Sequence, residues 1–156
     1  MSDTTKGWLG LAARLVIACV LIGAGASKRA APVEEFEVVI EAYDIVPPDA
    51  AHTIAALLPW AELLIGFSLL AGFATPAASG AAGAMFAGFI FALLSTKARG
   101  MELPNCGCFG SSFHLPTSVT IVMDALLLLC AVLAWRFGAR RLSLDNWARQ
   151  GYTGRA

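Results

Sequence analysis

Charged residues are scarce in this chain of 156 residues, of which they make up 14%. Eleven basic and eleven acidic side chains give a net charge of zero, and the sequence contains no footprint of nucleic-acid binding. Hydrophobic residues instead make up 58% of the chain, and its mean hydropathy is +0.70. This composition is far too apolar for an ordinary soluble domain. The sequence therefore predicts a domain embedded in a lipid bilayer.

Four long apolar runs, at roughly residues 8–27, 51–73, 77–96 and 118–137, predict four transmembrane helices. Each run approaches the ~20 residues that a helix needs to cross the hydrocarbon core. The first run is expected to be a span rather than a cleaved signal peptide, because Arg14 interrupts it and Lys28 and Arg29 follow it. The predicted fold is all-α: a four-helix transmembrane bundle over residues 1–140, then a short cytoplasmic basic tail over residues 141–156.

Basic residues are spread unevenly between the two sides of these spans. Cytoplasmic loops of membrane proteins are enriched in lysine and arginine, so both termini are expected in the cytoplasm. By parity, the first and third loops then face the periplasm of a cell inner membrane, where disulfides persist. The residues on the terminal side are Lys6, Arg136, Arg140, Arg141, Arg149 and Arg155, and those in the other two loops are Lys28, Arg29, Lys97 and Arg99.

The first outer loop contains the pattern of an amphipathic helix. Apolar residues follow a 3,4,3 spacing, and acidic residues follow the same spacing one position later. This helix is expected to cover the bundle as a lid, and the alternative is a docking surface for a soluble partner. The apolar residues are Val33, Phe36, Ile40 and Tyr43, and the acidic ones are Glu34, Glu37, Glu41 and Asp44.

Small residues repeat every fourth position along the third predicted span, at Gly80, Ala84, Gly88 and Ala92. Such a stripe lets another helix approach closely. We expect the contact to lie within the bundle, because four helices must bury such surfaces, rather than in a homodimer.

Two cysteines, Cys106 and Cys108, flank Gly107 in the loop between the third and fourth spans. A disulfide over one residue closes almost no loop, so it adds little stability, and its strain favours exchange. The pair is therefore predicted to be redox-active, and the alternatives are an idle thiol pair or a metal site joined by His114. No metal is predicted, because the cysteine pair supplies two ligands and fixed metal centres generally use three or four.

Two further cysteines, Cys19 and Cys130, occupy the middle of the first and fourth spans. Buried packing is the expected role of such residues. The alternative is a second redox pair, if the two helices adjoin with the sulfur atoms facing.

Four ionisable residues within or at the end of the spans are candidates for functional or structural ion pairs: Arg14, Lys28, Glu62 and Asp124. Each costs several kcal/mol in hydrocarbon unless it is paired. Estimated depths favour a pair between Arg14 and Glu62, and a second between Lys28 and Asp124 beneath the cysteine loop. Both a structural role and a proton route are open to these groups.

Several of these residues together resemble the methylamine utilisation protein MauE family, one of the DoxX-like groups of membrane proteins. The most specific element is the segment 106–110, Cys-Gly-Cys-Phe-Gly, and the resemblance covers about residues 8–137. The other matching positions are Arg14, residues 23–28, Tyr43, Pro47, residues 59–62, Gly66 and Leu70.

This resemblance implies a four-helix accessory protein that works with a periplasmic thioredoxin-like partner. Its role would be the maturation of methylamine dehydrogenase, whose small subunit needs many disulfides. Cys106 and Cys108 would then form a thiol–disulfide oxidoreductase site, with electrons passing to or from a membrane carrier such as a quinone. Two alternatives are a subunit of a quinone-linked oxidoreductase, as found among DoxX relatives, and a noncatalytic assembly scaffold.

Overall fold

The computed structural model describes residues 3–101, 116–138, 143–145 and 147. The described residues form five long or medium helices and no strand, which confirms the predicted all-α fold. The helices are α1 (Asp3–Ala30), α2 (Val33–Glu41), α3 (Pro48–Ala71), α4 (Thr75–Ala98) and α5 (Thr117–Phe137).

Four of these helices are long and apolar enough to cross a membrane: Thr4–Ala30, Pro48–Ala71, Thr75–Ala98 and Thr117–Phe137. The four predicted spans are confirmed, and the chain has the helices of a multi-pass membrane protein. α3 begins three residues before the predicted boundary because Pro48, with its fixed φ, suits a first helical turn. At its other end, Gly72 stops α3 with a left-handed φ of 69°.

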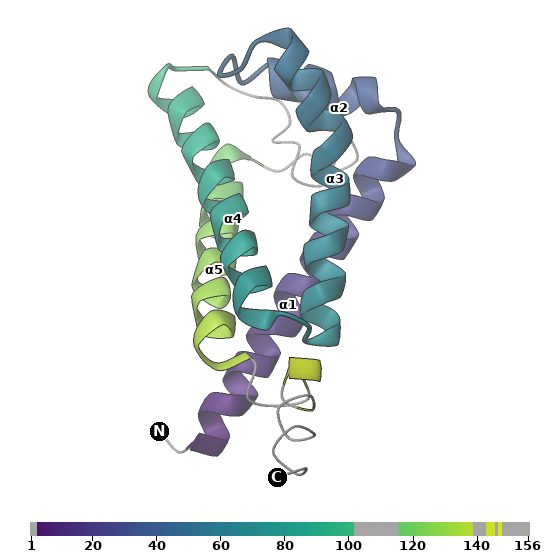
Figure 1. The fold of residues 1–156 in the computed structure, drawn as a ribbon. Coiled ribbons are helices and arrows are strands. Elements are labelled where there is room, and N and C mark those ends of the chain that lie inside the picture. The colour runs from purple at the N-terminus through teal and green to yellow at the C-terminus, as the bar shows by residue number, and fades with distance from the viewer. Residues whose placement is uncertain (1–2, 102–115, 139–142, 146, 148–156) are drawn as a thin grey trace.

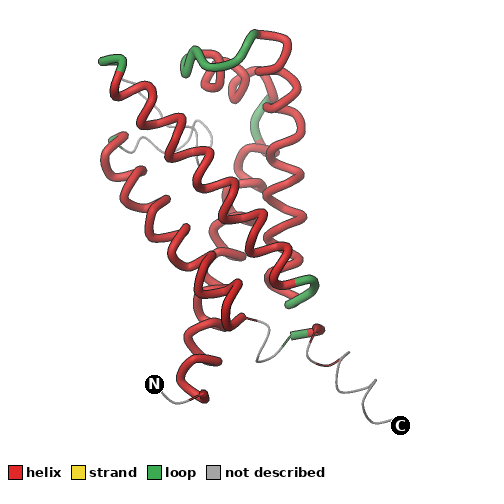
Figure 2. The backbone as a smooth tube through the Cα atoms, turned by 60° about the vertical axis from the view of Figure 1, so that its left-hand side comes forward, coloured by secondary structure: helices red, strands yellow, loops and turns green. Residues whose placement is uncertain are grey.

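The four spans run side by side, and α2 lies across one end of them (Figure 1). α1 packs against both α3 and α5, and α4 packs mainly against α5. The view in Figure 2 shows α1 beginning at the end opposite to α2, where α3 turns into α4 and α5 finishes. We refer to these as the α2 end and the turn end. The predicted cysteine loop connects α4 and α5, whose joined ends lie at the α2 end.

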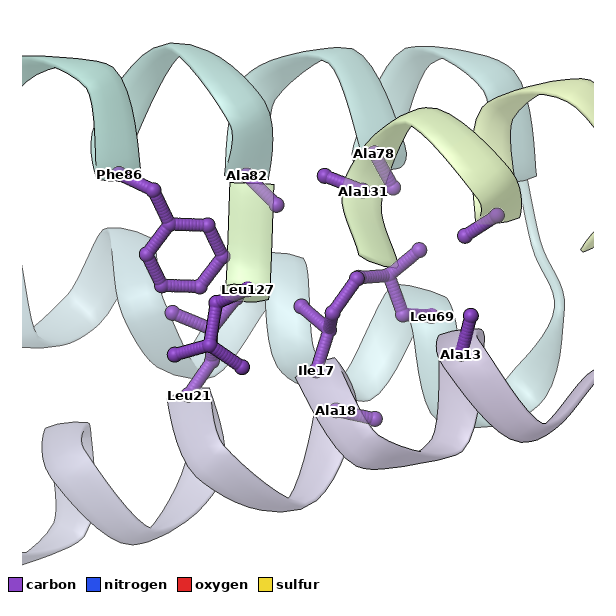
Figure 3. Packing of buried hydrophobic residues seen from close by; sticks show 11 residues of the cluster. Ala13, Ile17, Ala18, Leu21, Leu69, Ala78, Ala82, Phe86, Leu127 and Ala131 are labelled. Atoms are coloured by element: carbon purple, nitrogen blue, oxygen red, sulfur yellow. The ribbon is translucent and has the colours of Figure 1, made fainter. Parts of the chain in front are cut away.

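The buried core mixes large and small side chains from all four spans. Figure 3 shows Ile17 and Leu21 of α1 beside residues of the facing helices, among them Leu69, Phe86 and Leu127. Alanines fill the positions between them, which lets the helix backbones come close together. The alanines are Ala13, Ala18, Ala78, Ala82, Ala131 and Ala134.

Close approach of α1 to α3 fixes how these two helices align. A Cβ atom built on Gly25 would lie 2.9 Å from the carbonyl oxygen of Pro59, and one built on Gly66 would lie 3.3 Å from the carbonyl oxygen of Ala18. Only glycine fits at these positions without displacing the partner backbone. Gly25 is therefore opposite Pro59, and Gly66 opposite Ala18.

The small-residue stripe of α4 does not pack inside the bundle, so that prediction is wrong. Gly80, Ala84 and Gly88 are exposed, and a Cβ atom added to either glycine would meet nothing within 4 Å. The buried face of α4 is instead the row that contains Phe86 and Leu93, whose larger side chains fill the core. A period of four residues identifies a helix face, but it does not tell which face turns inward.

Candidate functional site

A buried ion pair joins α1 to α3 near the α2 end. The Nζ atom of Lys28 lies 2.6 Å from Oε1 of Glu62, and the two side chains are 0% and 1% exposed. Side chains on a helix lean toward its N-terminus, so Lys28 reaches back by about one turn to the level of Gly25. Glu62 lies at this level, since a Cβ atom on Gly25 would be 3.2 Å from the Cβ of Glu62.

Two phenylalanine rings flank the ammonium group of Lys28. Its Nζ lies 5.2 Å from the ring centroid of Phe36 in α2 and 6.0 Å from that of Phe89 in α4. Aromatic faces at such distances attract a cation, particularly where water is excluded. Phe36 is the buried residue of α2, so the helix covers the ion pair as the predicted lid. Phe36 was predicted from the apolar stripe, whereas no pattern in the sequence indicated Phe89.

Polar contacts hold α2 and the segment after it to two different spans. Nδ1 of His52 in α3 lies 2.7 Å from Oε2 of Glu37. Arg99, beyond the end of α4, donates hydrogen bonds to the carbonyl oxygens of Tyr43 and Asp44. The lid and the segment after it are therefore attached to both α3 and the end of α4.

The carboxyl group of Glu62 uses one oxygen for Lys28. Its other oxygen, Oε2, is buried and has no hydrogen-bond partner within the part of the chain that the structure describes. A carboxylate held in this way can serve as a fixed counter-ion for lysine, and its second oxygen can accept a proton. The site therefore suits either structural pairing or proton transfer in a low-dielectric environment.

Arg14 does not pair with Glu62, so the predicted pair is wrong. Nη1 of Arg14 donates a hydrogen bond of 3.0 Å to the carbonyl oxygen of Gly138, and a Cβ atom on Gly72 would lie 2.6 Å from the same nitrogen. Gly72 follows Glu62 by ten positions, which is ~15 Å of helix. The antiparallel alignment of α1 and α3 thus brings Lys28, rather than Arg14, to Glu62.

Residues that follow α5 bind the turn between α3 and α4, next to Arg14. The carboxylate of Asp145 accepts hydrogen bonds from the backbone amides of Ala74 (2.8 Å) and Thr75 (2.7 Å), which begin α4. Ser143 Oγ donates a 2.7 Å hydrogen bond to the carbonyl oxygen of Gly72. Asp145 also attracts the Arg14 guanidinium. We call Arg14, Gly72, Ser143 and Asp145 the clamp. The sequence placed residues 143 and 145 in a tail, and no local pattern indicated this cap.

Asp124 is buried on α5, with 2% of its surface exposed. Leu127, one turn further along α5, belongs to the same core cluster as Leu21. Asp124 therefore lies between that cluster and the α2 end, toward the level of Lys28. The pairing of Asp124 with Lys28 stays a prediction.

The four cysteines differ in where they lie in the chain and in the bundle. Cys19 is exposed on the outer face of α1, so its predicted burial is wrong, whereas Cys130 is half-buried against the core. Cys106, Cys108 and His114 lie outside the described residues, and the redox pair stays a prediction. Among the residues that the structure describes, no three His, Cys, Asp or Glu side chains form a group that could hold a metal ion.

Comparison with known proteins identifies the family of the chain. The family model described as "Methylamine utilisation protein MauE" matches residues 6–137. The chain is similar to the methylamine utilization protein MauE of Paracoccus denitrificans, with 33% identity over 124 residues, 79% of this chain and 66% of the relative.

It is also similar to the protein of the same name from Methylophilus methylotrophus, with 33% identity over 108 residues, 69% of this chain and 54% of the relative. The chain thus spans between about half and two thirds of the length of these relatives. No solved structure matches the chain. The extent of the family match shows that the chain belongs to the methylamine utilisation protein MauE family.

Proposed function

We propose that the chain is a membrane accessory protein of methylamine utilisation, in which Cys106 and Cys108 exchange disulfides with a soluble thioredoxin-like protein. The exchange would support disulfide formation in a periplasmic client, which the family resemblance suggests is methylamine dehydrogenase. The observation that carries this proposal is the spacing of two thiols around Gly107, in the connection between two membrane spans of a MauE-family chain.

The chemistry of the exchange is balanced between the two proteins. A thiolate of one protein attacks the disulfide of the other, and a mixed disulfide forms. The second thiol then attacks the mixed disulfide and releases the products. One cysteine pair is oxidised while the other is reduced, so that two electrons and two protons pass between them.

We propose that the α2 end faces the periplasm and the turn end the cytoplasm. Lys6 of α1 and Arg136 of α5 lie toward the turn end, as the positive-inside rule requires of the cytoplasmic side. At the α2 end, Lys28 and Arg99 face the carboxylates of Glu62 and Asp44, which reduces the positive charge of that side. Disulfides in the connection between α4 and α5 would then lie in an oxidising compartment.

The outward face of α2 offers a surface for the soluble partner. Glu34, Glu35 and Glu41 are exposed there around Val38, which is 63% exposed. An acidic face is repelled by anionic lipid and attracts a partner with basic residues near its active site. α2 would thus cover the ion pair with one face and contact the partner with the other.

The redox state of the loop can be read by labelling intact membranes with a bulky, membrane-impermeant maleimide after equilibration in graded thiol buffers. We expect two labels per chain after reduction and none after oxidation, and no label on the Cys106→Ser/Cys108→Ser variant. The matched control is Cys19→Ser/Cys130→Ser, which should behave as the wild type because both residues lie within spans. Two labels that persist in every oxidising buffer would contradict the redox assignment.

The biological role can be tested in a methylamine-oxidising strain that lacks its own copy of the gene. The Cys106→Ser/Cys108→Ser variant is expected to restore less than a tenth of the methylamine dehydrogenase activity restored by the wild type, because the client cannot complete its disulfides. Cys19→Ser/Cys130→Ser should restore full activity. Full activity with the loop variant would instead support a noncatalytic scaffold.

A further inference from the structure

An apolar hollow lies between α2, α3 and α4 toward the α2 end, and a second is lined by residues of α3 alone. One has a volume of about 310 Å³ and is lined by residues that include Tyr43, Ile54, Gly88 and Phe89. The second has a volume of about 240 Å³ and follows α3 from Thr53 to Ala61. Ile54 lines both, so the two hollows adjoin at this residue. We call the two hollows together the α3–α4 groove.

The groove lies at the depth of the hydrocarbon core. Gly88 is thirteen residues into α4, or ~20 Å from the turn end, and α3 and α4 are both candidate membrane spans. Except for Thr53 and Tyr43, the side chains that line the groove are apolar. A polar ligand would lose its hydration here without gaining enough hydrogen bonds in return.

The groove is too small to enclose a helix. A helix with its side chains is ~10–12 Å across. By contrast, 310 Å³ is about ten times the ~30 Å³ that one water molecule occupies in the liquid. This is room for a narrow chain of carbon atoms, which can also follow the extension along α3.

We propose that the α3–α4 groove binds one acyl chain of a membrane phospholipid from the leaflet on the α2 side. The chain removes the apolar lining of both hollows from contact with disordered lipid and gains close packing along its length. Binding of this chain does not depend on the redox function.

The bound chain has a structural link to the buried ion pair. Phe89 lines the groove, and the centroid of its ring lies 6.0 Å from Nζ of Lys28. Ile40 and Tyr43, which also line the groove, continue from the lid helix that carries Phe36. A chain packed against these residues holds Phe89 and the lid in place over Lys28.

Two glycines of the same α4 stripe provide a test variant and a matched control. A Cβ atom on Gly88 or Gly80 meets nothing within 4 Å, so leucine can be introduced at either position without a backbone clash. Leucine at 88 projects into the groove, whereas leucine at 80 is two turns away and outside it. Gly88→Val serves as the smaller replacement if Gly88→Leu does not fold.

The test is native mass spectrometry of protein extracted from its membrane in a mild detergent, followed by delipidation and rebinding of palmitoyl-oleoyl phosphatidylethanolamine. We expect one retained lipid on the wild type and on Gly80→Leu, and at least a fivefold smaller lipid-bound fraction on Gly88→Leu. Rebinding should restore one lipid only to the first two.

Other outcomes would overturn the proposal. A wild type that neither retains nor rebinds lipid has no acyl-chain site. Equal lipid on all three proteins would place the bound lipid elsewhere. A wild-type dimer that Gly80→Leu and Gly88→Leu both convert to a monomer would mean that a second copy of the chain covers this face.

Discussion

Lys28→Met is expected to lower the free energy of unfolding by about 3–5 kcal/mol, because it leaves the Glu62 carboxylate buried without a counter-ion. Both side chains are almost completely inaccessible, so water cannot replace the missing partner. The double variant Lys28→Met/Glu62→Leu should recover part of the loss, since it removes both charges of this pair and keeps apolar volume. Equilibrium unfolding in mixed detergent micelles gives the free energy of unfolding of the wild type, of Lys28→Met and of the double variant.

Arg29→Met is the matched control for this prediction. Arg29 is the next residue of α1, and its guanidinium lies 4.9 Å from the ring centroid of Trp60 on the exposed surface. An exposed cation–π contact contributes only about 0.5–1 kcal/mol. A double variant as unstable as Lys28→Met, or a Lys28→Met variant no worse than Arg29→Met, would show that the charge pair is not what stabilises this site.

Gly72→Ala is expected to cost about 2–4 kcal/mol, through two separate effects. Gly72 has a φ of 69°, in the left-handed region that costs other residues about 1–2 kcal/mol. Its Cβ atom would also lie 2.6 Å from Nη1 of Arg14 and 2.7 Å from Cα of Ser143, which forces the clamp apart at a further cost of about 1–2 kcal/mol. Unfolding free energy in micelles measures the total.

Gly100→Ala separates the two effects. Gly100 has a φ of 71°, but a Cβ atom there would meet nothing within 4 Å. This variant should therefore show the backbone cost alone, near 1–2 kcal/mol. If Gly72→Ala and Gly100→Ala lower the free energy of unfolding equally, the clamp accommodates a methyl group at position 72 without being destabilised.

The sequence predicted the helices well because each follows from a local property. Length and hydropathy define the spans, and the spacing of Phe36 with its apolar neighbours defines α2. Ionisable residues in the spans were expected to need partners, and Lys28, Glu62 and Asp124 are all buried in the bundle.

Pairing was not predictable, because it depends on the alignment of helices that are distant in sequence. The pair between Arg14 and Glu62 was predicted from the estimated depths of the two residues alone. The alignment of α1 with α3 is set by close backbone contact at Gly25 and Gly66, and this shifts Arg14 to the level of Gly72. The predictions for Cys19 and for the α4 stripe were wrong for a related reason. Hydropathy does not distinguish the lipid-facing side of a helix from its core-facing side when both sides are apolar.

The cap that Asp145 provides also sets an order of events during synthesis. Asp145 follows Ala74, whose amide it caps, by 71 residues, so the hairpin of α3 and α4 leaves the ribosome long before its cap exists. The first amides of α4 must therefore rely on other hydrogen-bond acceptors during membrane insertion. Asp145, which is translated after α5, then completes the N-terminal turn of α4, so assembly at the turn end waits for α5 to arrive.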